Sequence, residues 1–132
     1  FVICALVSVH LENLDKAIKE ISRILKKGGT LITSDLNPHI RRGTKKFWGE
    51  TIPYFTKKKI YLIKAPIHSI KDYLNAFNKV DLELVKLKEI RLMDSPRAVR
   101  NKQIKKSFPS KEEFNKFKRK NFCVIFKLKK RG

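Results

Sequence analysis

The first seven residues form a continuous apolar run, and the pattern changes from Leu14 onward. The run Phe1 to Val7 shows no alternation of apolar and polar positions, which is typical of a strand covered on both faces in a parallel sheet. From Leu14, apolar residues recur at helical spacing and charged residues fill the positions between them. The apolar stripe consists of Leu14, Ala17, Ile18, Ile21 and Leu25. The pattern predicts a strand followed by a helix that packs on the sheet.

Capping residues bound this helix, and a second strand follows it. Asn13 can accept a hydrogen bond from the first turn, while Gly28 or Gly29 can supply the left-handed residue that ends the helix. The run Thr30 to Ser34 then predicts a strand parallel to the first, joined to it by a right-handed crossover. Asp35 follows at the carboxyl end of this strand, where open α/β sheets place their ligands.

Three further elements are predicted downstream. Apolar residues at helical spacing between Ile70 and Phe77 predict a second amphipathic helix. In the strand-like run Leu82 to Ile90 the apolar residues change parity, which indicates a bulge or cover on both faces. The run Phe122 to Leu128 predicts a final strand. Together these elements predict an α/β domain.

The order of these elements, and their sequences, resemble class I S-adenosylmethionine-dependent methyltransferases. The family's fourth through fifth strands are similar to ALVSVHLENLDKAIKEISRILKKGGTLITSDLNP, and its later helix and sixth strand are similar to HSIKDYLNAFNKVDLELVKLKEI. Its seventh strand, which inserts antiparallel beside the fifth, is similar to NFCVIFKLKK. The resemblance implies a partial Rossmann-like methyltransferase sheet of the fourth to seventh strands with flanking helices. We therefore expect residues 1–132 to be the C-terminal portion of a single methyltransferase domain.

The same resemblance implies a cofactor and one side of its site. The family binds S-adenosyl-L-methionine, and Ala5 and Leu6 would lie beside it. The family's glycine-rich loop, and the acidic residue that holds the ribose hydroxyls, are absent from these 132 residues. We therefore expect the N-terminal half of the same domain to be missing, and this fragment to be inactive on its own. Without that half, the edge of the first strand would be unpaired and one sheet face thinly covered.

Four polar side chains could serve the methyl acceptor. The sulfonium is already an activated donor, so the enzyme must align the acceptor and manage any proton on it. His10 could contact the acceptor or accept its proton, and a structural role fits it equally well. Asp35, His39 and His68 could line the acceptor side, while a structural or surface role stays open for both histidines. These three residues lack tight metal-ligand spacing, so we expect no metal.

The segment 37–67 is rich in aromatic residues and follows the ligand end of a strand. In the resembling enzymes this stretch helps to form the acceptor pocket or a lid over it. Aromatic walls that include Trp48 would exclude water and position a methyl acceptor. Trp48 and its neighbours could instead only cover the sheet. The three lysines at 57–59 fit a solvated turn better than a recognition element.

The net charge is +20, from 32 Lys and Arg against 12 Asp and Glu. Such a charge can serve RNA binding, because cations neutralise phosphates and release counterions. The segment 97–120 is the candidate patch, since Phe108, Phe114 and Phe117 are interleaved with its cations and could stack on bases. The rival explanation is a lysine-rich codon bias on an ordinary surface, with Phe114 and Phe117 packed against the sheet.

Cysteine usage and hydropathy favour a reduced, cytoplasmic protein. Cys4 and Cys123 lie in strand-like runs without paired metal-ligand spacing, and neither a signal peptide nor a long apolar segment is present. We accordingly expect no membrane partner.

Two functions fit the sequence. The resemblance implies methyl transfer to an unidentified acceptor, which could be a protein lysine, an rRNA, a small molecule, a lipid or a quinone. The alternative is a truncated, non-catalytic basic module that binds RNA or a partner protein. Protection by the cofactor against unfolding would favour the first function, and salt-dependent RNA binding without a cofactor effect would favour the second.

Overall fold

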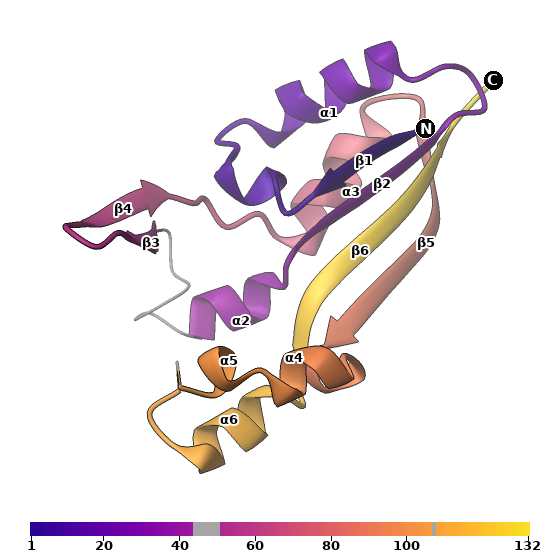
Figure 1. Cartoon of the computed structure of the whole chain (residues 1–132). Coiled ribbons are helices and arrows are strands. Elements are labelled where there is room, and N and C mark those ends of the chain that lie inside the picture. Colours follow the sequence, from indigo (N-terminus) through magenta and orange to yellow (C-terminus); the bar gives the residue numbers. More distant parts are fainter. Residues whose placement is uncertain (44–50, 107) are drawn as a thin grey trace.

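The computed structural model describes residues 1–43, 51–106 and 108–132, without the side chains of 41–43 and 51–55. Its main element is a four-stranded sheet. The strands lie in the order β1 (Val2–Ala5), β2 (Thr30–Leu36), β6 (Asn121–Lys130) and β5 (Leu82–Arg91) (Figure 1). β1 and β2 are parallel, whereas β6 is antiparallel to both β2 and β5. The final strand therefore lies inside the sheet, beside β2, as expected from the sequence.

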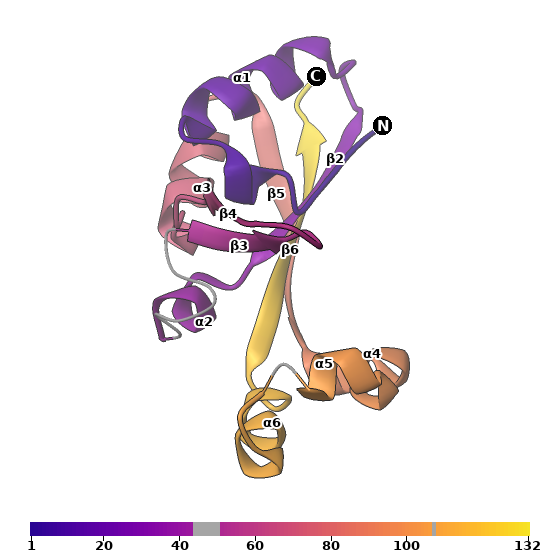
Figure 2. The ribbon, with the colours of Figure 1, turned by 60° about the vertical axis from the view of Figure 1, so that its left-hand side comes forward.

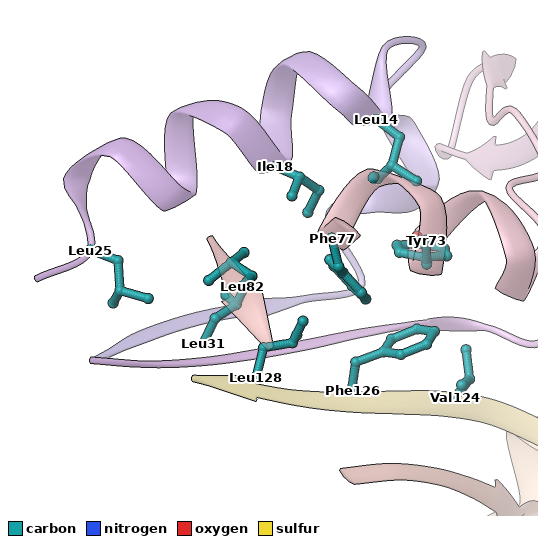
Figure 3. Close-up of a cluster of buried hydrophobic side chains, with 11 residues drawn as sticks. Leu14, Ile18, Leu25, Leu31, Tyr73, Phe77, Leu82, Val124, Phe126 and Leu128 are labelled. Atoms are coloured by element: carbon teal, nitrogen blue, oxygen red, sulfur yellow. The ribbon is translucent and has the colours of Figure 1, made fainter. Parts of the chain in front are cut away.

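Two helices, α1 (Leu14–Ile24) and α3 (Ile70–Asn78), pack on one face of the sheet (Figure 2). Ile18 from α1 and Phe77 from α3 meet Leu31 and Phe126 from the strands in one buried cluster (Figure 3). Each such side chain contributes about 1.5–3 kcal/mol when it is fully removed from water. The amphipathic stripes predicted for both helices are thus confirmed, because their apolar residues supply this core.

Both ends of α1 follow the expected capping chemistry. The Asn13 side chain accepts a hydrogen bond from the Lys16 N–H at 2.8 Å. Gly28 adopts the left-handed conformation with φ +71°, whereas Gly29 is constrained by space, since a Cβ there would lie 2.7 Å from the Lys26 carbonyl oxygen. The turn is tied to the end of β6, because the Gly28 N–H donates to the Lys130 carbonyl and the Lys130 N–H donates to that of Gly29.

β1 is shorter and less covered than its apolar run suggested. The strand ends at Ala5 rather than Val7, and Ile3 is 62% exposed while Val2 and Cys4 pack toward the core. Among the described residues one face of β1 is covered, because the helices α1 and α3 lie on the same face of the sheet, in agreement with the thinly covered second face expected of this fragment. β1 is also an edge strand, in agreement with the expected unpaired edge.

In β5, the register against β6 shifts between Leu84 and Lys86. This irregularity confirms the bulge suggested by the change of parity in the sequence. It adds one residue to β5 and so lets Leu82 and Leu87 both reach the core side.

Residues 37–43 and 51–67, the described part of the segment 37–67, include regular elements. They contain α2 (Pro38–Gly43) and an antiparallel hairpin of β3 (Thr51–Phe55) and β4 (Ile60–Lys64). Upstream, the short 3-10 helix η1 (Ser8–His10) connects β1 to α1.

Short helices join β5 to β6 and enclose a second, smaller core. They are η2 (Leu92–Asp94), α4 (Pro96–Arg100), α5 (Lys102–Lys106) and α6 (Lys111–Phe117). Phe114 and Phe117 are buried there, and the Phe108 ring lies 4.8 Å from that of Phe117 between centroids. Phe114 and Phe117 are thus buried against neighbouring aromatic side chains and are not available to stack on RNA bases. The expectation of base stacking is wrong for these two residues. They pack among these helices, with Phe122 of β6, rather than across the open sheet face.

Candidate functional site

The carboxyl ends of β1 and β2 meet at a sharp, left-handed turn. The pairing register places Ala5 opposite Ser34, and the Leu6 N–H donates to the Ser34 carbonyl at 3.0 Å. Leu6 has φ +56°, the one left-handed backbone among the described non-glycine residues. That conformation costs a leucine about 1–2 kcal/mol. The turn leaves the side chains of Leu6 and Val7 exposed at the ligand end of the sheet.

A chain of hydroxyl groups supports this turn from inside. The buried Ser8 hydroxyl lies 3.5 Å from that of Thr33, and the Thr33 hydroxyl donates to the Cys4 carbonyl at 3.1 Å. These contacts join η1, β1 and β2 immediately behind Leu6. The turn is consequently held by tertiary contacts, which is the condition under which a strained backbone persists.

Tyr73 of α3 connects the ends of the two strands to the helix layer. Its hydroxyl donates to Oδ2 of Asp35 at 2.5 Å, and the Leu36 N–H donates to Oδ1 at 2.7 Å. Burial, followed by the adjacent Asp35 charge, raises the pKa of the Tyr73 phenol above its ordinary value. Tyr73 therefore remains a protonated donor to a buried carboxylate.

His68 also meets Tyr73, so the aromatic ring links two of the residues singled out from the sequence. The His68 ring stands edge-on to Tyr73 with centroids 6.0 Å apart, and its Nε2 lies 2.6 Å from the Leu11 carbonyl oxygen. Asp35 itself is buried beneath α3, with its carboxylate held by donors from α3 and β2. The structure thus brings Asp35 and His68 together through Tyr73, in the packed layer between the sheet and α3.

A pocket opens where β2 runs into α2, and we call it the Asn37 pocket. It has a volume of about 430 Å³. Its lining residues come from the link between β2 and α2, from α2 and β5, from the end of α6, and from the residues that lead into the start of β6: Asn37, His39, Ile40, Glu89, Phe117, Arg119, Lys120 and Asn121.

Asn37 and Glu89, which both line this pocket, are held by four hydrogen bonds. The Asn37 side-chain amide donates to Oε1 of Glu89 at 2.7 Å, and the Asn37 side-chain oxygen accepts from the His39 N–H at 3.0 Å. The Asn37 backbone N–H donates to the Phe122 carbonyl at 2.9 Å, while the Asn121 amide donates to Oε2 of Glu89 at 3.2 Å. The Glu89 carboxylate is therefore held between the side chains of Asn37 and Asn121. Together with the cationic Arg119 and Lys120, it can receive a ligand that carries both donors and acceptors.

The residues singled out from the sequence fall in three places. Ala5 ends β1, Leu6 forms the turn that follows it, and His10 ends η1; all three are exposed. His39 is exposed on the wall of the Asn37 pocket, whereas Asp35 and His68 belong to the layer around Tyr73. Trp48 lies outside the described residues. The polar candidates thus belong to neighbouring but separate groups.

Sequence reasoning missed the roles of Asn37, Glu89 and Tyr73. Asn37 follows the ligand end of β2 and could have been found by the criterion that selected Asp35. Tyr73 looked only like a member of an apolar helical stripe, and Glu89 lies 52 positions after Asn37. Within residues 1–43, 51–106 and 108–132, the structure contains no group of three His, Cys, Asp or Glu side chains that could hold a metal ion.

A comparison with protein families matches residues 1–33 to the family described as "Methyltransferase domain". The matched residues contain β1, η1, α1 and the first half of β2, and so include the left-handed turn at Leu6. A comparison with curated proteins finds no match.

Three solved structures with a similar fold carry methyltransferase descriptions. A Listeria monocytogenes protein assigned as an S-adenosylmethionine-dependent methyltransferase matches with TM-score 0.63 and 12% identity over 98% of this chain and 60% of its own. A Haloferax volcanii protein assigned as a methyltransferase was solved in complex with the Trm112 activator. It matches with TM-score 0.64 and 16% identity over 98% of this chain and 53% of its own. The third is an O-methyltransferase from a trans-AT PKS multienzyme of Brevibacillus brevis, in complex with S-adenosyl-L-homocysteine. It matches with TM-score 0.58 and 15% identity over 98% of this chain and 43% of its own.

These similarities confirm the fold expected from the sequence. The chain has the mixed α/β architecture of Rossmann-like methyltransferases, and its sheet corresponds to the fourth to seventh strands. It spans about 60% of the length of the Listeria structure and less of the other two.

Proposed function

We propose that this chain is the C-terminal part of a class I methyltransferase domain that transfers a methyl group from S-adenosyl-L-methionine to an acceptor. The observation that carries the proposal is the sheet order β1-β2-β6-β5 with antiparallel β6 inside it, joined to the match of residues 1–33 with a methyltransferase domain. The Brevibacillus neighbour with bound S-adenosyl-L-homocysteine supports this choice of cofactor.

Ala5 and Leu6 would hold one side of the cofactor. The turn fits this role because Leu6 and Val7 offer exposed apolar surface at the ligand end of the parallel strands, and because the hydroxyl chain behind them holds the backbone in place. When bound, S-adenosyl-L-methionine supplies a methyl group already activated on a sulfonium. The glycine-rich loop and ribose-binding acid would come from an N-terminal half outside these 132 residues, so this fragment alone would be inactive.

On the acceptor side, each candidate has a role that follows from its position. His10 would accept the acceptor's proton, since it is exposed at the end of η1, shortly after the turn at Leu6. Asp35 and His68 would act as positioning residues, because both contact Tyr73 beneath the strand ends.

The Asn37 pocket, with His39 on its wall, would receive a polar part of the acceptor. The segment 37–67, which includes Trp48, would cover that side as a lid.

The test uses the protein expressed from its complete reading frame, with S-adenosyl-L-homocysteine titrated by calorimetry. We expect saturable binding that Leu6→Asp abolishes, because a carboxylate would replace the apolar contact. Ile24→Asp is the matched control, since Ile24 is also an exposed apolar residue but lies on α1. Absence of binding at millimolar ligand, or equal loss in both variants, would overturn the proposal.

The alternative is a cytoplasmic, non-catalytic basic module that binds RNA or a partner protein. Exposed cations along α4, α5 and α6 support this second candidate, although two of its expected stacking rings are buried. The Haloferax neighbour, solved with a methyltransferase activator, supports a protein partner for this fold. If RNA binding falls steeply with salt and is insensitive to S-adenosyl-L-homocysteine, the alternative takes precedence.

A further inference from the structure

The hairpin of β3 and β4 projects from the body of the protein and is joined to it through α2 and the connection to α3 (Figure 1). Its turn is held by Thr56, whose N–H donates to the Lys59 carbonyl at 2.9 Å and whose hydroxyl accepts from the Lys59 N–H at 2.9 Å. The hairpin is therefore a defined element with a closed tip.

Strand β4 of this hairpin exposes four consecutive apolar or aromatic side chains. Ile60 is 64% exposed, Tyr61 52%, Leu62 71% and Ile63 40%. Because successive side chains of a strand point to opposite faces, apolar surface is presented on both faces of β4. An isolated two-stranded hairpin is marginal in water, and exposed apolar patches of this kind mark interaction sites. The hairpin thus has the character of a docking element.

Cations stand at both ends of this apolar strand. Lys57, Lys58 and Lys59 are exposed at the tip, and Lys64 is exposed at the other end. Lys64 reaches Oε1 of Glu12 at 3.4 Å, but both side chains are largely exposed, and such a pair contributes little. The surface therefore combines apolar side chains in the middle with positive charge on either side.

We propose that this hairpin docks on the surface of an anionic lipid membrane. Aliphatic side chains and Tyr61 would enter the boundary between headgroups and acyl chains, while the flanking lysines would bind anionic headgroups. A second copy of the chain fits less well, because it brings the same lysines and a net charge of +20. RNA would satisfy the lysines, but Ile60, Leu62 and Ile63 have no aromatic ring on which bases could stack.

This inference goes beyond the proposed function and revises the expectation that no membrane is involved. That expectation rested on the absence of a segment able to span a bilayer, and the described residues indeed contain no helix long and apolar enough to do so. A hairpin that lies in the interface needs no such segment.

The experiment is vesicle co-sedimentation of the full chain at low salt, with phosphatidylcholine vesicles that do or do not contain 30% phosphatidylserine, a composition on the order of that of anionic leaflets. We expect binding to the anionic vesicles only. The triple variant Lys57→Gln, Lys58→Gln, Lys59→Gln should weaken partitioning about 100-fold, since each lysine near an anionic surface is worth about 1 kcal/mol. Leu62→Ser should weaken partitioning about tenfold, because it removes an apolar side chain that would be buried in the membrane interface.

Two matched controls keep the test specific. The triple variant Lys102→Gln, Lys105→Gln, Lys106→Gln removes the same charge from exposed positions on α5, and Ile24→Ser removes an equally exposed apolar side chain from α1. Both should bind vesicles like the parent chain. Equal losses in hairpin and control variants would show a general charge effect and overturn the proposal.

Three other results would also overturn it: no binding to anionic vesicles, a dimer that Leu62→Ser abolishes, or oligonucleotide binding that takes the place of vesicle binding. Thermal melting of each variant checks that the fold is intact. S-adenosyl-L-methionine is not needed in this assay, so its outcome is independent of the methyltransferase proposal.

Discussion

The Tyr73 hydroxyl and the Asp35 carboxylate lie 2.5 Å apart and join α3 to the end of β2. Both side chains are buried, so the phenol takes the place of water as a donor to one carboxylate oxygen. Hydrogen bonds to charged groups contribute about 1.5–3 kcal/mol, more than those between neutral groups. The pair therefore fixes the helix layer over the strand end that precedes the Asn37 pocket.

Replacing Tyr73 with Phe should lower the free energy of unfolding by about 2 kcal/mol, because the carboxylate loses its phenolic donor. Tyr61→Phe is the matched control, since Tyr61 is 52% exposed. Removal of its hydroxyl should lower the free energy of unfolding by less than about 0.5 kcal/mol. Urea denaturation of the three proteins at pH 7 measures the difference. Equal stabilities for both variants would contradict the importance of the contact.

Tyr73 should also make the protein less stable at alkaline pH. Burial and the neighbouring carboxylate raise its pKa in the folded state, so the unfolded chain releases the phenolic proton first, from about pH 10. Stability from this group is complete below pH 10 and falls as the pH rises above it, by at most about 1.4 kcal/mol per pH unit. Denaturation between pH 9 and 11 should show a smaller fall in Tyr73→Phe than in the parent. Parallel pH profiles would be inconsistent with the raised pKa.

Ile18 should be among the most sensitive positions in α1. It is 1% exposed and packs in the core that α1 forms with α3 and the sheet, so Ile18→Ala should lower the free energy of unfolding by about 2–5 kcal/mol. Ile24→Ala removes the same atoms from a side chain that is 61% exposed and should change stability by about 0.5 kcal/mol or less. Thermal melting that ranks these variants in the opposite order would refute the assigned helix face.

Leu6→Gly should stabilise the turn slightly. Glycine tolerates φ +56° without the steric cost that a leucine bears, whereas it loses more backbone entropy on folding. We expect a net gain of about 0.5 kcal/mol in denaturant unfolding, because little apolar burial is lost at this exposed side chain. Leu11→Gly serves as the comparison, since Leu11 has an extended backbone and should be destabilised. A clear loss of stability in Leu6→Gly would argue against the left-handed turn.

The basic segment 97–120 can be tested apart from stability. Lys105→Ala with Lys106→Ala should leave the melting temperature nearly unchanged, because both side chains are exposed. If the segment binds RNA, the double variant should bind oligonucleotides severalfold more weakly. The slope of log K against log salt concentration should fall by the contribution of about two phosphate contacts. The matched variant Lys26→Ala with Lys27→Ala, at the end of α1, should leave binding unaltered. Equal binding by all three proteins would favour codon bias as the origin of the charge.

Sequence reasoning succeeded where a signal is local. Three features of α1 each depend on a few neighbouring positions: the apolar stripe that includes Ile18, the Asn13 cap and the glycine turn. Their structures could therefore be predicted from the sequence. The order of the sheet came instead from the resemblance to a family, because no pattern in β6 alone says which strands it joins. The bulge in β5 was visible because a change of parity interrupts alternation.

Long-range contacts between polar groups left no local trace. Asn37 and Glu89 are 52 positions apart, and Asp35 and Tyr73 are 38 apart, so neither pair shares a periodic pattern. The hairpin was missed for a related reason: the turn between β3 and β4 contains Thr and three lysines, without the Asn-Gly or Asp-Gly signal of tight hairpins. Burial of Phe114 and Phe117 could be suspected from their helical spacing, but their partners could not.

The position of β6 constrains how the protein can be made. Among the described residues β5 pairs in this sheet only with β6, and β2 has β6 along one whole side. The paired positions of β2 and β6 are 87 to 99 residues apart, from Leu36 with Cys123 to Thr30 with Lys129. During synthesis, β1, β2, α1 and α3 leave the ribosome well before the strand that closes the sheet. The nascent chain must therefore keep two β edges and an apolar layer apart from other chains until Asn121–Lys130 emerges. Yield in cells is thus expected to depend on translation rate and chaperone supply as much as on the stability of the finished fold.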